Sequence, residues 1–292
     1  MTVPTSIMAS SDDLPRAVAT AFADPPDGTM RVVRAAGYEW HMLEWGRPSD
    51  PALLLVHGVT SSSETFWRVG PCLAAAGRRV IAVDLPGHGR TGGWRGRHRW
   101  IETAEDLAHL IGTTDLQPDH LAVLGHSWGG MTVASLPAAG FRPERLILLD
   151  PPALSVAQLV PLTNDPTERR YEHVADAIAA VRASGVEWSE GDIQAKAIGL
   201  TQIDEEAVRA IYLENGDYDG GLAALSDPSA TGIPTWIIRG DPAHGGLIAD
   251  EKLPALAERV GPDHIVTIAG ASHSPQRTHP EATTLAILQA LG

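Results

Sequence analysis

The five residues Gly125–Gly129, with the sequence GHSWG, are the most informative stretch of this chain. They fit the pattern G-x-S-x-G, in which a serine occupies a tight turn between a buried strand and a helix. The context agrees with this pattern, because an apolar run at 120–124 precedes the turn and small residues at 130–139 follow it. We therefore expect Ser127 to be an exposed nucleophile. The alternative is an ordinary serine that caps a helix.

Short apolar runs without polar alternation recur on both sides of this turn. Such runs are typical of strands that are buried on both faces of a parallel sheet. Helical patterns separate the runs, which predicts right-handed crossovers and helices on both sides of the sheet. The predicted strands are 31–34 and 38–44 (an opening hairpin), 52–56, 79–83, 120–124, 145–149, 235–239 and 264–268, and the predicted helices are 65–76, 102–115, 128–139, 249–260 and 279–291.

Two segments depart from this alternation of strands and helices. Residues 151–232 begin with prolines and contain no strand-like run. Their helical patterns lie at 167–184, 190–199, 204–214 and 219–226. We interpret 151–232 as a helical cap inserted between two parts of the core, 31–150 and 233–292, with a separate helical domain as the alternative. The proline-containing residues 1–30 are predicted to form a loosely ordered N-terminal arm with a short helix at 12–22.

A nucleophilic serine needs a base, and the base needs a carboxylate that orients it. His273 follows the last predicted strand and precedes the C-terminal helix, so it is expected at the same sheet edge as Ser127. His244, in the loop after 235–239, is the rival candidate for the base.

These motifs resemble those of the α/β-hydrolase superfamily. Four of them occur in the order found in that superfamily, and the resemblance covers 31–150 and 233–292. They are His57-Gly58 after a strand, the run 84–89 (DLPGHG), the turn Gly125–Gly129, and His273 after the last strand. The resemblance implies an α/β-hydrolase fold, with a mostly parallel central sheet flanked by helices and an inserted helical cap.

The resemblance also implies an oxyanion hole formed by two backbone N–H groups, those of Val59 and Trp128. Around it we expect a substrate pocket that includes residues from the loop after 52–56, from the helix that follows, and from the cap. The predicted pocket residues are Gly58, Trp67, Trp188 and Tyr212.

The acid that orients the base has two candidates. Many members of the superfamily place it three residues beyond a glycine after the strand at 235–239, but here that residue is Ala243. Asp241 lies directly after that glycine, and Asp150 ends the strand that follows the nucleophile. We favour Asp150, because its strand is expected to pair beside the nucleophile strand. Either aspartate is also compatible with a plain turn role.

The combination predicts a serine hydrolase that cleaves a carboxylic ester or lactone through an acyl-serine intermediate. Amide, thioester or carbon–carbon bond hydrolysis on the same fold is an alternative. A second alternative, from another class, is a non-catalytic module that binds a small molecule. Serine at position 127 argues against the halide- and epoxide-opening relatives, which carry aspartate there.

Charge, motif context and cysteine content disfavour several other classes of function. The 292 residues carry a formal charge of −14, which disfavours binding to nucleic acid or to anionic membranes. The run Gly87–Gly92 is a literal G-x-G-x-x-G, but a loop rather than a helix follows it, so a dinucleotide site is disfavoured. With Cys72 as the single cysteine and no metal-ligand spacing, we expect neither a metal nor a cofactor. The N-terminus shows no secretory pattern, which favours a cytoplasmic enzyme, and the oligomeric state stays open.

Overall fold

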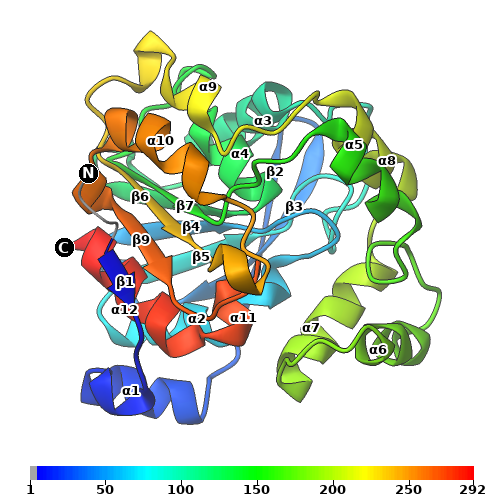
Figure 1. The fold of residues 1–292 in the computed structure, drawn as a ribbon, viewed down its shortest axis with the longest axis horizontal. Helices are drawn as coiled ribbons and strands as arrows, with labels where there is room; N and C mark the ends of the chain where they lie inside the picture. Colours follow the sequence, from blue (N-terminus) through cyan, green and yellow to red (C-terminus); the bar gives the residue numbers. More distant parts are fainter. Residues whose placement is uncertain (1–4) are drawn as a thin grey trace.

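The computed structural model describes residues 5–292, so the first four residues of the predicted N-terminal arm lie outside the described part. Nine strands form one sheet in the order β1-β9-β8-β7-β6-β4-β5-β3-β2 (Figure 1). Neighbours from β1 to β5 in this order are parallel, whereas β3 and β2 continue the sheet antiparallel. The strands are β1 (Thr5–Ile7), β2 (Thr29–Ala35), β3 (Tyr38–Trp45), β4 (Ala52–Val56), β5 (Arg79–Val83), β6 (Leu121–His126), β7 (Arg145–Leu149), β8 (Thr235–Arg239) and β9 (Ile265–Ile268).

Helices cover both faces of this sheet (Figure 1). On β4, Leu54 and Val56 face the layer that contains α3 and α4, whereas Leu53 and Leu55 face α2 and α12. Burial on both faces explains why the central strands are uninterrupted apolar runs. The helices are α1 (Arg16–Ala23), α2 (Val69–Ala75), α3 (Trp100–Gly112), α4 (Trp128–Ala134), α5 (Val156–Leu159), α6 (Val174–Ala183), α7 (Glu190–Thr201), α8 (Glu205–Glu214), α9 (Leu222–Leu225), α10 (Leu253–Val260), α11 (Pro275–Thr278) and α12 (Pro280–Leu291).

Several predicted helices are shorter in the structure, and proline explains two of them. A proline ring lacks the N–H that an interior helical position donates. The helix predicted at 249–260 begins only at Leu253, which puts Pro254 in its first turn. The helix predicted at 128–139 ends at Ala134, three residues before Pro137. The helix predicted at 167–184 is α6 alone, and Thr167 lies instead in a turn where its backbone N–H and hydroxyl donate to Asp165.

The N-terminal segment differs from the predicted loose arm. Residues 5–7 form strand β1, which pairs in parallel with β9 at the edge of the sheet. The predicted short helix is α1, whose Val18 packs against Cys72 of α2. Because the pairing of β1 with β9 joins residues more than 250 positions apart, no local pattern announces it.

Residues 151–232 contain helices α5 to α9 and no strand. Helix α7 packs against the 3-10 turn Ser63–Phe66, which follows the loop after β4. Figure 1 shows α6 and α7 beside the sheet, with α5 and α8 above them in the view. None of the helices formed by residues 5–292 has the length and apolar character that crossing a bilayer requires.

Candidate active site

Three side chains from separate strand ends lie in a hydrogen-bonded row. Ser127 follows β6, Asp150 follows β7, and His273 follows β9. The Oγ atom of Ser127 lies 2.9 Å from Nε2 of His273, and Nδ1 of His273 lies 2.7 Å from Oδ2 of Asp150. This is the arrangement of a nucleophile, a base and an orienting acid. The rival base His244 lies instead beside Asp241, 3.1 Å from its Oδ2 atom.

The turn that carries Ser127 is strained, and its glycines are required by close backbone contacts. Ser127 has φ +55° and ψ −125°, a conformation that residues other than glycine rarely adopt. A Cβ atom at Gly125 would collide with the carbonyl oxygen of Gly129, and one at Gly129 would collide with the carbonyl oxygen of His57. The turn therefore holds the Ser127 hydroxyl, partly exposed, at the start of α4.

Asp150 is completely buried, and its carboxylate is held from several directions. Oδ1 accepts the backbone N–H of Gly240, and Oδ2 accepts the backbone N–H of Leu247, both at 3.0 Å. Asp241 is turned away from His273. Its carboxylate accepts the N–H groups of Gly270 and Ala243, which lower its pKa.

The loop after β4 is braced by a buried histidine. His57 accepts the N–H of Leu85 at Nε2, so Nδ1 carries the proton and donates to the carbonyl of Gly58 at 2.7 Å. Burial lowers the pKa of His57 to about 4, which keeps the ring neutral. Next in this loop is Val59. Neither its N–H nor that of Trp128 donates a hydrogen bond to another group of residues 5–292.

A cavity of about 520 Å³ opens at Ser127 and His273. Of the predicted pocket residues, Gly58, Trp188 and Tyr212 line it, whereas Trp67 does not, so the prediction for Trp67 is wrong. The indole N–H of Trp67 donates to Asp192 at 3.0 Å, and its ring packs on Gly191 in the first turn of α7. Apolar side chains supply much of the remaining wall. They are Leu154, Leu159, Leu162, Val186 and Leu247.

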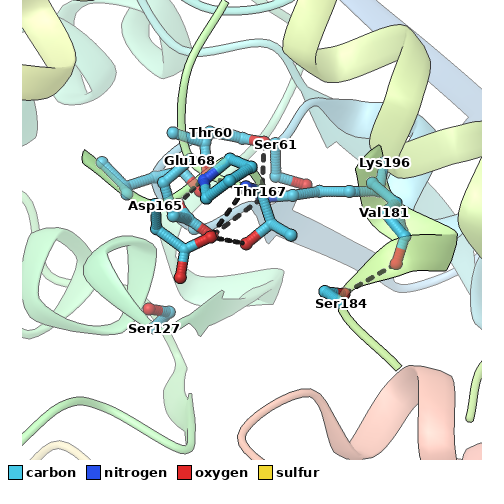
Figure 2. Close-up of polar contacts among 12 residues, drawn as sticks. Thr60, Ser61, Ser127, Asp165, Thr167, Glu168, Val181, Ser184 and Lys196 are labelled. Atoms are coloured by element: carbon cyan, nitrogen blue, oxygen red, sulfur yellow. Dashed lines mark hydrogen bonds and ion pairs between the residues drawn. The ribbon is translucent and has the colours of Figure 1, made fainter. Parts of the chain in front are cut away.

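A charged network ties the inserted segment to the loop after β4. Lys196 of α7 donates to the carbonyl oxygen of Thr60 (3.2 Å), to its Oγ1 (2.7 Å) and to Glu168 Oε1 (3.1 Å). Glu168 Oε2 also accepts the hydroxyl groups of Thr60 and Tyr212. Figure 2 shows Thr60, Glu168 and Lys196 close together, and Thr60 is itself at φ +55°. The network therefore holds the residue that follows Val59.

Comparison with known proteins identifies the family. The model of the Alpha/beta hydrolase family matches residues 53–286. The chain belongs to this family. Its nine-stranded, mostly parallel sheet is the fold of that family.

Individual members of the family are similar over most of the chain. Lipase LipV of Mycobacterium tuberculosis is 27% identical, covering 86% of this chain and 97% of the relative. The 2-(acetamidomethylene)succinate hydrolase of Mesorhizobium japonicum is 30% identical, covering 82% of this chain and 87% of the relative. A crystal structure of E-2-(acetamidomethylene)succinate hydrolase superimposes with a TM-score of 0.75 at 22% identity. The match covers 90% of this chain and 99% of that structure's chain. Two other relatives are 36% and 38% identical to this chain over the matched regions. This chain spans only 35% and 36% of their own length.

Reasoning from the sequence missed the three charged residues Glu168, Lys196 and Arg277 in the cavity wall. For Lys196 a signal existed. Ile193, Ala197 and Leu200 form the buried stripe of α7, and a lysine three residues after the first of them occupies the same face. For Glu168 there was none, since it lies in an irregular loop before α6. Within residues 5–292, no group of three or more His, Cys, Asp or Glu side chains is placed to hold a metal ion.

Proposed function

We propose that this hydrolase cleaves a carboxylic ester or lactone with Ser127 as its nucleophile. The observation that carries the proposal is the row Ser127–His273–Asp150, with contacts of 2.9 and 2.7 Å. A serine hydroxyl is a weak nucleophile by itself, and a neighbouring imidazole activates it by accepting its proton.

In the proposed reaction, Ser127 Oγ attacks the ester carbonyl while its proton passes to Nε2 of His273. Asp150 accepts the hydrogen bond of Nδ1–H and stabilises the positive imidazolium that forms. The N–H groups of Val59 and Trp128 donate to the developing oxyanion. Each such donor contributes about 3 kcal/mol to lowering the barrier.

Collapse of this intermediate breaks the bond to the alcohol, which leaves with the proton of His273. Water then attacks the acyl-serine, again with His273 as the base, and releases the acid and the free Ser127 hydroxyl. We propose that 151–232 acts as a cap in this cycle, since Trp188 and Tyr212 of this segment line the cavity that receives the substrate.

Labelling with a fluorophosphonate tests this function and separates it from a module that only binds. The reagent reacts with activated serines, so we expect one adduct on Ser127, located by peptide mass spectrometry, and hydrolysis of p-nitrophenyl acetate. Ser127→Ala should lose both, with kcat lowered about 10⁴- to 10⁶-fold. Retention of more than a tenth of the activity in that variant, with a normal circular dichroism spectrum, would contradict the proposal.

Cleavage of a C–N bond is a second candidate, favoured by the similarity to the 2-(acetamidomethylene)succinate hydrolase. The same residues suffice, provided that His273 protonates the departing nitrogen. A p-nitroanilide and a p-nitrophenyl ester with the same acyl group distinguish the two candidates. A kcat/KM for the anilide within tenfold of that for the ester would favour the amide.

A further inference from the structure

Arg277 is a buried cation in the wall of the active-site cavity. It belongs to α11, four residues after His273, and it lines the cavity together with Ser127. Only 6% of its surface is exposed. The reaction proposed above gives this side chain no role.

The partners of Arg277 are neutral. Nε and Nη2 donate to Oγ1 of Thr65 at 3.3 and 2.9 Å, and Nη2 lies 3.5 Å from Oγ of Ser61. The indole ring of Trp188 covers the guanidinium at 4.4 Å. Among residues 5–292, no carboxylate lies within 4.0 Å of the guanidinium, and Nη1 makes no hydrogen bond.

The other charges near this end of the cavity have partners. Lys196 uses its three N–H donors on Thr60 and Glu168. Asp192 accepts from Trp67 and Ser189 and lies 3.8 Å from Arg68. Burial lowers the pKa of Arg277, but a guanidinium stays protonated at neutral pH. One positive charge is therefore left without a contacting anion.

We propose that Arg277 binds a carboxylate of the substrate, so that this hydrolase acts on esters or amides that carry a second, anionic carboxylate group. The proposal rests on the proposed function, because it requires the scissile carbonyl at Ser127. A guanidinium matches a carboxylate through paired N–H donors, and a single unpaired positive charge matches one negative charge. Leu159 and Val186 also line this cavity, and their apolar side chains suit a hydrocarbon part of the substrate.

Two matched ester pairs test this inference. Mono-p-nitrophenyl adipate against methyl p-nitrophenyl adipate places the carboxylate on the acyl side of the scissile bond. Acetoxybenzoate against its methyl ester places it on the alcohol side. We expect wild-type kcat/KM to favour the anionic member of at least one pair by tenfold or more. If the wild-type protein prefers the anionic ester by less than threefold in both pairs, the inference is overturned, and no variant is needed to show it.

Variants then assign the preference to Arg277. In Arg277→Met the ratio of kcat/KM between anionic and neutral ester should fall about 10- to 100-fold, mostly through KM, as expected for a lost charge-assisted hydrogen bond. Arg277→Lys should recover part of the ratio. The control Arg182→Met, at an exposed position of α6, should keep it. A ratio unchanged in Arg277→Met would show that the residue only supports packing.

The failure of this inference can be told from failure of the proposed function. A protein that is labelled at Ser127 and hydrolyses the neutral esters as well as the anionic ones would contradict the inference alone. A protein that hydrolyses neither member of either pair and is not labelled would contradict the proposed function and, with it, this inference.

Discussion

Nδ1 of His273 lies 2.7 Å from Oδ2 of Asp150, although β8 separates the strands from which these residues come. The contact is possible because the Asp150 carboxylate passes the end of β8, where Oδ1 accepts the N–H of Gly240. A side chain at Gly240 would meet the carbonyl oxygen of Ser272 at 2.5 Å, so glycine leaves room for the loop that carries His273.

This geometry predicts which aspartate supports catalysis. Asp150→Asn should lower kcat by about 10⁴-fold, because an amide in this place favours the wrong imidazole tautomer. Asp241→Asn should lower it less than tenfold, since its carboxylate caps a turn. Steady-state rates on p-nitrophenyl acetate, with folding checked by circular dichroism, decide between them. The reverse order of effects would place the acid after Gly240.

The two candidate bases, His273 and His244, can likewise be distinguished by the activity of their alanine variants. His273→Ala should abolish turnover of p-nitrophenyl acetate, because no other imidazole lies within hydrogen-bond distance of Ser127 Oγ among residues 5–292. His244→Ala should leave kcat within threefold of wild type, as its side chain is 58% exposed and contacts Asp241. Loss of activity in His244→Ala with retention in His273→Ala would reassign the base.

The ion pair between buried Lys196 and half-buried Glu168 should be important for stability. Lys196→Met leaves the Glu168 carboxylate without its cation but with the hydroxyl groups of Thr60 and Tyr212, and it should lower the free energy of unfolding by about 1–3 kcal/mol. The double variant with Glu168→Gln removes both charges and should be less destabilised than the single variant. Urea unfolding measures both. A double variant less stable than Lys196→Met alone would show that the pair does not act as charge compensation.

Acid should destabilise the fold through its buried neutral histidines. Burial lowers the pKa of His88 to about 3, against about 6.5 in an unfolded chain. Between these values only the unfolded chain binds the proton, so stability falls as the pH drops below about 6.5 and does not depend on this group above it. At pH 5 the free energy of unfolding is therefore lower by about 2 kcal/mol because of His88.

Urea unfolding at pH 7 and pH 5 checks this expectation. The stability lost between the two pH values should be smaller in His88→Asn than in wild type by about that 2 kcal/mol. His109→Asn, at an exposed position of α3, should lose as much as wild type. Equal losses in wild type and His88→Asn would mean that His88 is protonated in the folded protein.

Much of the fold was predictable because its causes are local. The central strands are apolar runs buried on both faces, and the predicted runs at 52–56, 79–83, 145–149 and 235–239 coincide with β4, β5, β7 and β8. The edge strand β1 was not predictable, since it is three residues long and forms only by pairing with distant β9.

The sequence by itself determined the turn at Gly125–Gly129, since the pattern G-x-S-x-G between an apolar run and a helical stretch is a local signal. It also placed His273 after the last strand. Only the tertiary structure decided that Asp150 rather than Asp241 contacts His273, that Trp67 turns away from the cavity, and that Arg277 is buried in its wall. The physical reason is that strand-end aspartates look alike along the chain, whereas side-chain neighbours depend on packing between distant segments.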